Sequence, residues 1–307
     1  MVTPEILVRW MEGGGFRFAP LEIDGIDNRP VLAVNKEEMA REETCAVAIG
    51  MDGNAYLQIL SEGVRTAMDR RRPLPVVRFA DGEYAFYAGS LECNGLYRQA
   101  ESKGRIKEAL PVHAEDLRRL SKTGFLAPLI FPGNTGAAES TLGALWRRIR
   151  NKPSATTFLA FLERHGVTLD RGNYLPFYVV YAWLSSPSFA RLVDGRRVCL
   201  VNADRNDEAC YDWFARLGSK PEILFAPIPP EFVATRWPSL REEVLSRIPA
   251  DTEICLVGAG IGALGVCVDI AERLSIPAVD AGHVLNMMTG RVDKSNGPRL
   301  YTLWKTP

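Results

Sequence analysis

The chain of 307 residues has only three histidines, no net charge and no two cysteines spaced as Cys-x-x-Cys. Its 37 Lys and Arg balance its 37 Asp and Glu, so the charge gives no reason to expect a nucleic acid or an anionic membrane as partner. The six cysteines are scattered, and several stand in apolar runs. This pattern argues against a disulfide framework or a zinc site and favours reduced, buried thiols.

Long hydrophobic segments are also missing. No apolar run reaches the roughly 20 residues that a membrane-spanning helix needs, so any membrane contact is expected to be peripheral. The first residues, MVTPE, lack a basic region followed by an apolar core, which predicts no signal peptide. Hydrophobic and charged residues make up 47% and 24% of the chain, as in ordinary globular proteins. We therefore expect a cytoplasmic protein with a sizeable core.

Strands and helices alternate along most of the chain. Short apolar runs predict strands, and amphipathic segments predict helices between them; the strands are expected at 76–79, 125–131, 197–202, 222–227, 253–257 and 277–280, and the helices at 54–71, 104–120, 138–150, 154–164, 207–217, 240–248 and 262–274. Residues 174–184 fit a buried helix and a buried strand equally well. The alternation predicts a Rossmann-like open, mostly parallel sheet with helices on both faces over residues 51–307. Residues 1–50 are expected to form an N-terminal extension with a strand near 28–34.

The stretch VVRFADGE at residues 76–83 is the first candidate site. A buried strand ends here in one base and two acids, and ligands of open α/β sheets bind at this end of the strands. In extended or turn geometry Asp81 and Glu83 can point to one side. Carboxylates suit a hard divalent cation and Arg78 suits a phosphate, so the stretch predicts a metal–phosphate site. The alternative is a helix N-cap with a surface ion pair.

Two more predicted strands end in polar residues. One ends at Asn202 and is followed by Asp204, for which the alternative is an ordinary helix N-cap. The last strand ends at Asp280 and is followed, after a glycine, by His283. At a strand end shared with Asp81, His283 would serve as a metal ligand or an acid–base group, the alternative being a structural histidine. The other two histidines are expected to be exposed and incidental.

The strand at 253–257 runs into a glycine-rich turn, GAGIGALG, which opens a helix. Glycines let the backbone approach a phosphate that the helix N-terminus stabilises. The turn matches the G-x-G-x-x-[GA] dinucleotide fingerprint, and Asp280 stands at the distance of a ribose-binding acid. In a dinucleotide domain, however, the fingerprint follows the first strand. Here it comes late in the chain, which favours another phosphate ligand such as the diphosphate of a nucleotide sugar, bound by Gly258, Gly260 and Gly262.

Together these segments resemble bacterial glycosyltransferases of the D-type fold. That family carries an Arg-Phe-Gly-Asp-Gly-Glu stretch, which stands here as RFADGE at 78–83, with Ala80 in place of a glycine. It also ends in a strand closing with Asp-x-Gly-His, here DAGH at 280–283, and has an Ile-Pro-Pro segment, here IPPEF at 228–232. The resemblance spans about residues 54–290 and is poor over 85–190.

The resemblance implies a metal-dependent hexosyltransferase that moves a sugar from a UDP-glucose-like donor to the hydroxyl of a glycan or glycoconjugate. It implies Mn²⁺ or Mg²⁺ as cofactor. The expected metal ligands and catalytic residues are Asp81, Glu83 and His283, and the expected donor-binding residues are Arg78, Gly82, Asn202, Asp204, Gly258, Gly260, Gly262 and Asp280.

Two other classes fit the residues less well. One is a Rossmann-type enzyme dependent on NAD(P) or S-adenosylmethionine, which would use the turn at 258–265 and Asp280. The other is a binding module that has kept the fold and lost turnover; the joint presence of Arg78, Asp81, Glu83 and His283 argues against it.

Overall fold

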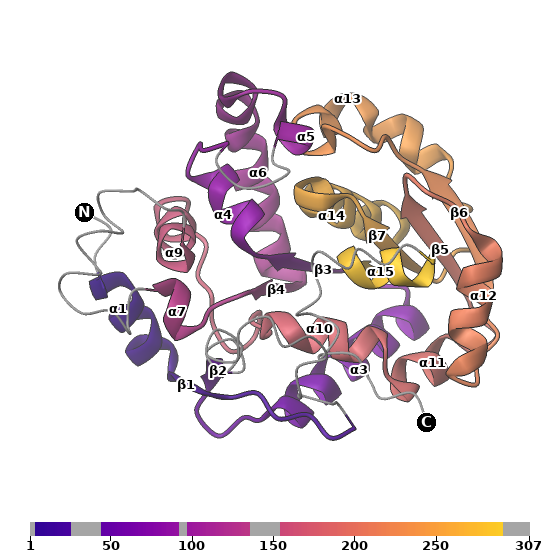
Figure 1. The fold of residues 1–307 in the computed structure, drawn as a ribbon, viewed down its shortest axis with the longest axis horizontal. Helices are drawn as coiled ribbons and strands as arrows, with labels where there is room; N and C mark the ends of the chain where they lie inside the picture. Colours follow the sequence, from indigo (N-terminus) through magenta and orange to yellow (C-terminus); the bar gives the residue numbers. More distant parts are fainter. Residues whose placement is uncertain (1–3, 26–43, 92–96, 136–153, 291–307) are drawn as a thin grey trace.

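The computed structural model describes residues 4–25, 44–91, 97–135 and 154–290. Within them six parallel strands form one sheet in the order β4-β3-β8-β7-β5-β6 (Figure 1). The strands are β3 (Leu74–Phe79), β4 (Phe125–Pro128), β5 (Arg197–Asn202), β6 (Glu222–Pro227), β7 (Ile254–Gly258) and β8 (Pro277–Asp280). The predicted open parallel sheet is confirmed. Each predicted strand from residue 76 onward corresponds to an observed strand, and its ends agree to within three residues.

Helices cover both faces of the sheet, as Figure 1 shows. One face carries α6 (Lys103–Thr123), α13 (Val233–Ser246) and α14 (Ala263–Leu274); the other carries α3 (Gly53–Arg70), α10 (Phe177–Leu184), α11 (Pro187–Val193) and α12 (Asp207–Arg216). Residues 174–184, which the sequence allowed to be a helix or a strand, contain the helix α10. Because both faces are covered, the central strands are buried throughout and read as continuous apolar runs.

Shorter elements complete the described chain. They are α1 (Pro4–Gly14), β1 (Phe16–Pro20), β2 (Thr44–Ala48), α4 (Asp81–Tyr87), α5 (Tyr97–Ala100), α7 (Pro132–Thr135), α9 (Ala155–Arg164), the 3₁₀ turn η1 (Gly260–Gly262) and α15 (Gly282–Met288). The predicted strand at 28–34 and the predicted helix at 138–150 lie outside the described residues. No helix of the described ranges is long and apolar enough to cross a membrane.

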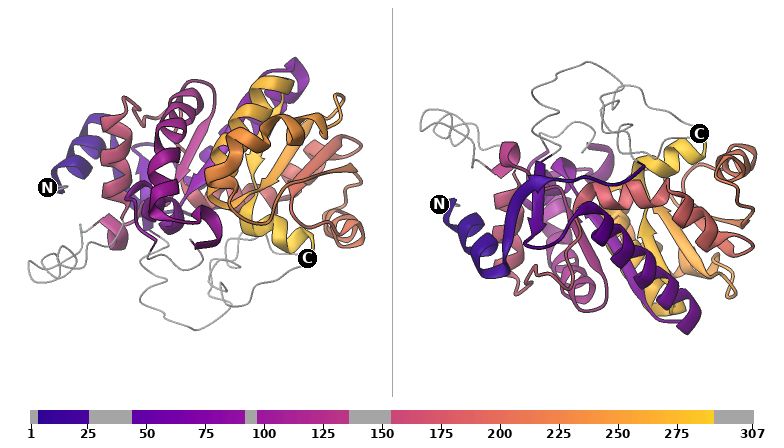
Figure 2. Two further views of the ribbon diagram at one scale, coloured as in Figure 1. Left: turned by 90° about the horizontal axis from the view of Figure 1, so that it is seen from above. Right: turned by 90° about the horizontal axis from the view of Figure 1, so that it is seen from below.

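The N-terminal elements lie at one end of the molecule, far from β6 (Figure 2). Strands β1 and β2 pair antiparallel, a pairing that the sequence did not predict. The Trp10 ring stacks on Phe16 with centroids 4.5 Å apart, and its indole N–H donates to the Leu169 carbonyl at 2.8 Å. The Tyr174 hydroxyl donates to the Ala46 carbonyl at 2.6 Å. These elements therefore share one apolar core with the α/β sheet.

The connections between strands change direction at β5 and β7, which are neighbours in the sheet. From β5 the chain moves outward through α12 to β6, whereas from β7 it moves the other way through α14 to β8. With right-handed crossovers these helices lie on opposite faces. The carboxyl ends of β5 and β7 are therefore the topological switch point of the sheet, where open α/β proteins form a crevice.

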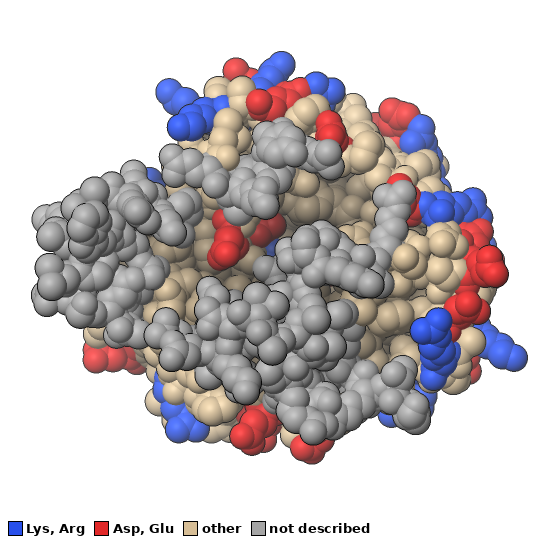
Figure 3. Space-filling model, viewed as in Figure 1, with Lys and Arg blue, Asp and Glu red and all other residues tan. Residues whose placement is uncertain are grey.

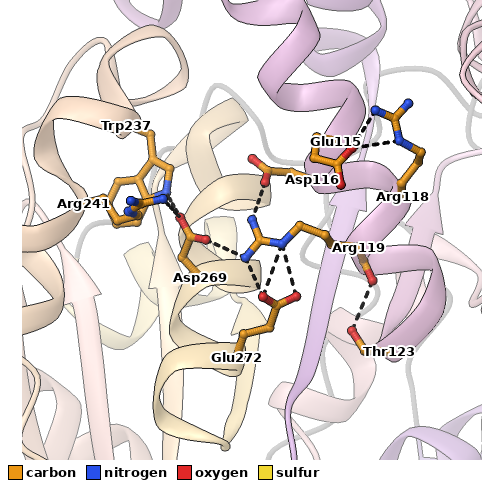
Figure 4. A network of polar contacts seen from close by, with 9 residues as sticks. All are labelled: Glu115, Asp116, Arg118, Arg119, Thr123, Trp237, Arg241, Asp269 and Glu272. Carbon is orange, nitrogen blue, oxygen red and sulfur yellow. Dashed lines mark hydrogen bonds and ion pairs between the residues drawn. The ribbon is translucent and has the colours of Figure 1, made fainter.

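One face of the sheet is held by a charged network between α6 and α14 (Figure 4). The Arg119 guanidinium lies among three carboxylates, with N···O distances of 2.7 Å to Asp116, 2.7 Å to Asp269 and 2.6 Å to Glu272. Asp269 also accepts a hydrogen bond from the Trp237 indole of α13 at 2.7 Å. One arginine thus links the three helices through two nearly buried aspartates.

Candidate functional site

Arg78, at the end of β3, is held by Asp280 at the end of the neighbouring strand β8. The Arg78 side chain donates from Nη2 to Asp280 Oδ1 at 2.8 Å and from Nε to the Asp280 carbonyl at 3.0 Å. The Arg78 backbone N–H donates to Asp280 Oδ2 at 3.2 Å. The two residues are 7% and 5% exposed. Two bonds from the guanidinium and one from the backbone N–H join Arg78 to the same partner and orient its side chain at the carboxyl edge of the sheet.

Aromatic rings from α10 support the same guanidinium. Its central carbon lies 4.4 Å from the Tyr181 ring centroid and 5.1 Å from that of Phe177, which is cation–π distance. Gly282, at φ +44°, passes so close that a Cβ there would overlap Arg78 Nη2. Among the described residues Arg78 Nη1 has no hydrogen-bond partner, whereas Nε and Nη2 both donate to Asp280.

The predicted acids Asp81 and Glu83 lie in the first turn of α4, not in an extended segment. Residues two apart on a helix do not lie on one face, so the common direction that extended or turn geometry would give the two carboxylates is not found, and the contact of Glu83 is that of the helix-cap alternative. Asp81 is exposed, while Glu83 is partly buried and its Oε2 accepts the backbone N–H of the N-cap residue Ala80 at 2.8 Å, which is one of the two bonds of a capping box. Figure 3 shows the acidic atoms over α4 beside a hollow in the molecular face.

Glu83 is held in a partly protonated state near neutral pH. Burial, and then the nearby Asp280 carboxylate, raise its pKa from 4.5 to about 7, against the lowering effects of the Ala80 N–H and of Arg78. A carboxyl group with a pKa in this range can take or give a proton under physiological conditions.

We expect Glu83→Gln to stabilise the free protein at pH 8 by about 2 kcal/mol, after allowance for partial exposure, and to have almost no effect at pH 4.5. The folded protein holds the Glu83 proton that the unfolded chain releases above pH 4.5, so wild-type stability falls as pH rises from 4.5 through 7. Gln resembles the protonated acid and still accepts the Ala80 N–H. Urea denaturation in EDTA across this range measures the difference.

Asp207 provides the control, since it also lies in the first turn of a helix. Its hydrogen bonds with Arg205 lower its pKa, so Asp207→Asn should lose rather than gain stability as pH rises. If the difference in the free energy of unfolding between Glu83→Gln and the wild type does not vary with pH, the raised pKa of Glu83 is contradicted.

His283 lies in the first turn of α15, directly after β8. Strand β8 pairs with β3, so the backbone positions of His283 and Asp81 share one edge of the sheet as predicted. The His283 side chain lies outside the described part of the structure, and its role as metal ligand or base stays a prediction.

The glycine turn and the α4 segment, far apart in sequence, meet in the structure. A Cβ at Gly82 would lie 4.0 Å from Ile261 of η1. At Gly260, which has φ +54°, a Cβ would overlap the Gln99 side chain, and at Gly262 it would lie 2.6 Å from Val233. The glycines therefore allow α5 and α13 to pack closely against the turn, and their role in binding a phosphate stays a prediction.

Asn202 and Gly258 are paired across the switch point. Asn202 is 6% exposed, and its amide Nδ2 donates to the Asp204 carbonyl at 3.1 Å. A Cβ on Gly258 would lie 2.8 Å from Asn202 Oδ1. The predicted polar end of β5 thus lies against the predicted glycine turn.

His113 corrects the expectation of an exposed, incidental residue. It is buried, its Nε2 donates to the Ala234 carbonyl at 2.8 Å, and its Nδ1 lies 3.3 Å from the Tyr87 hydroxyl. Since a carbonyl only accepts, Nε2 carries the proton. Burial lowers the His113 pKa to about 4. His113 is a neutral residue that joins α6 to α4 and α13.

The α4 segment presents one exposed carboxylate, that of Asp81, as a candidate ligand for a hard divalent cation. Among the side chains that the structure describes, no group of three or more His, Cys, Asp or Glu residues could hold a metal ion. Mg²⁺ and similar ions, however, commonly use one or two carboxylates and take their other ligands from water and substrate phosphate. Asp81 offers one exposed carboxylate of this kind, in the first turn of the helix that follows β3.

The fold defines a class: an open parallel α/β protein, here with the buried Arg78–Asp280 ion pair at the carboxyl edge of its sheet. Comparison with known protein families, curated proteins and solved structures finds no match. The functional argument therefore rests on the residues of this chain.

Proposed function

We propose that the protein is a cytoplasmic, metal-dependent glycosyltransferase that uses a nucleotide-sugar donor, UDP-glucose by resemblance, and a glycan or glycoconjugate hydroxyl as acceptor. The observation that carries the proposal is Arg78: a buried cation, fixed by Asp280, with Nη1 unpaired among the described residues and the Glu83 carboxyl close enough to act on its charge. The guanidinium group of arginine binds phosphate oxygens well. Burying a cation costs free energy that hydrogen-bond and ion-pair partners must offset, and an anionic ligand at Nη1 would add such a partner.

Each residue has a role in this reaction. Departure of the sugar leaves negative charge on the nucleoside diphosphate, and Arg78 Nη1 would bind the diphosphate oxygens as that charge grows. A divalent cation would supply further charge neutralisation when bound. Asp81 would hold the cation, and Glu83, with its pKa at about 7, would accept the proton of the acceptor hydroxyl. Asp280 keeps Arg78 oriented, and His283 stays a predicted ligand or base.

The contacts of Asp280 disfavour the dinucleotide alternative. In that class an acid at this position binds the ribose hydroxyls. Here both carboxylate oxygens of Asp280 accept hydrogen bonds from Arg78.

Asp81→Asn tests the proposal. With UDP-glucose and Mn²⁺, wild-type protein should hydrolyse the donor slowly or transfer its glucose, and EDTA should abolish the reaction. Asp81→Asn should reduce the rate about 10²–10³-fold, as when one group that stabilises the transition state is removed. Asp212→Asn is the matched control, because Asp212 is an exposed acid on the outer helix α12 and should leave the rate unchanged.

Two results would contradict the proposal. One is donor turnover that neither EDTA nor Asp81→Asn affects. The other is tight binding of NAD(P) or S-adenosylmethionine by protein that does not bind UDP, which would establish the alternative class.

A further inference from the structure

A cleft lies between α6 and α13, on the face of the sheet opposite to α10. Its volume is about 90 Å³, well above the roughly 10–15 Å³ that one water molecule needs, so it admits a small organic group. The start of α14 contributes Gly262 and Gly265 to the lining. Most of the rest is apolar: Ala109 and Val112 of α6, and Trp237 and Pro238 of α13. The Arg78–Asp280 pair takes no part in this cleft.

Asp116 places a carboxylate in the wall of the cleft. Its side chain is nearly buried, and its Oδ1 accepts a hydrogen bond from Arg119 at 2.7 Å, whereas its Oδ2 accepts none from the described residues. A Cβ at Gly265 would lie 3.2 Å from this Oδ2 and 2.6 Å from Cδ1 of Trp237, so the oxygen and the indole meet over the glycine. Figure 4 shows Asp116 between Arg119 and Trp237, with a contact drawn to Arg119 only.

The other polar side chains of the lining favour a ligand that donates hydrogen bonds. His113 uses both ring nitrogens within the protein, and Trp237 donates its indole N–H to Asp269. The Thr235 hydroxyl donates to the carbonyl of the α13 N-cap residue and keeps lone pairs that can accept. The side chains of the cleft therefore offer acceptors, and their donors are already committed.

The charges around the cleft favour a cation. Arg119 is the close partner of three carboxylates, and the next cation, Arg241, lies 4.0 Å from Asp269. Burial, and then Asp269, raise the pKa of Asp116 to about 6 despite Arg119. The carboxylate is thus ionised at neutral pH but poorly supplied with positive charge, and a second cation at its Oδ2 would be stabilised there.

We propose that this cleft binds the ammonium group of a small primary amine, with Asp116 Oδ2 as its ion-pair partner and Thr235 Oγ1 as a second acceptor. The indole of Trp237 lies within reach of a cation–π contact, and the apolar walls cover the alkyl carbons. A hard metal ion would require several oxygen ligands, and a guanidinium pairs best with both oxygens of a carboxylate. Only one oxygen of Asp116 is free of Arg119, which suits the compact ammonium group.

Nuclear magnetic resonance with n-propylammonium chloride tests the site. The indole N–H signal of Trp237, identified among the six tryptophans as the one absent from Trp237→Phe, should shift and reach saturation as the amine is added. Propan-1-ol and sodium propionate at the same ionic strength should not reproduce this shift, because the first lacks the charge and the second carries the opposite one.

Two variants separate charge from space. Asp116→Asn keeps an acceptor for Arg119 and removes the charge, so it should weaken propylammonium binding about tenfold or more. Glu115→Gln is the matched control, because Glu115 is the neighbouring acid, largely exposed and already paired with Arg118, and it should leave the affinity unchanged. Ala109→Leu leaves every charge in place and fills the cleft, so it should abolish binding. Circular dichroism checks that each variant is folded.

The proposal is overturned if the wild-type signal does not saturate, or if propan-1-ol produces the same saturable shift, which would make the cleft an apolar pocket. Unchanged affinity for propylammonium in a folded Asp116→Asn also overturns it. If Asp116→Asn does not fold, Ala109→Leu decides: loss of binding supports the cleft as the site, and retained binding refutes it.

Discussion

Arg78→Met should lower the free energy of unfolding by about 3–5 kcal/mol and remove the binding of pyrophosphate and UDP. The cost arises because Asp280, 5% exposed, would keep a buried negative charge without its cation. The loss of binding arises because the proposal assigns the diphosphate to this guanidinium, which two hydrogen bonds to Asp280 hold in place. Chemical denaturation and calorimetry measure the two effects separately.

A double variant separates the structural role of Arg78 from its ligand role. In Arg78→Met with Asp280→Asn no charge is buried, and the Asn side chain still accepts the backbone N–H of residue 78. Removing both partners of a buried pair costs far less than removing one, so more than half of the lost stability should return. Pyrophosphate binding should not return. If it does, Arg78 is a structural residue and the diphosphate site lies elsewhere.

The sequence predicts the strands well because each is short, apolar and buried on both faces, so the local pattern carries the information. It does not predict which strands are neighbours. The glycine turn after β7 comes late in the chain, which disfavours a first-strand fingerprint, yet β7 is a central strand at the switch point. Strand order depends on the crossover connections between distant segments, and the hydrophobic periodicity of a segment carries no information about its neighbours in the sheet.

The same limit applies to the site. Arg78 and Asp280 are each visible as charged residues at strand ends, but their pairing joins residues 202 positions apart. The part played by Tyr181 depends on α10 being a helix, which a uniformly apolar segment cannot reveal. The sequence predicts an exposed His113 because its helix is rich in charged residues. In the structure the side chain of His113 points to α4 and α13 and is buried there.

Arg119→Met should be strongly destabilising, by about 3 kcal/mol at pH 8, because it removes the shared partner of two nearly buried aspartates. It would leave Asp116, Asp269 and Glu272 without their shared cation, and the two aspartates are nearly buried. Burial, and then Asp269, already raise the Asp116 pKa to about 6, and loss of Arg119 would raise it further. The folded variant would then hold a proton that the unfolded chain releases above about pH 4, so the loss should be smaller at pH 5 than at pH 8.

Arg118 supplies the control on the same helix. Its guanidinium pairs at 2.6 Å with Glu115, which is largely exposed, and surface pairs of this kind contribute at most about 1 kcal/mol. Arg118→Met should therefore cost little and show no marked pH dependence. Urea denaturation of both variants at pH 5 and pH 8 gives the comparison. Equal losses for the two arginines would mean that the network of Figure 4 is a surface feature rather than the link that fixes α6, α13 and α14 against the sheet.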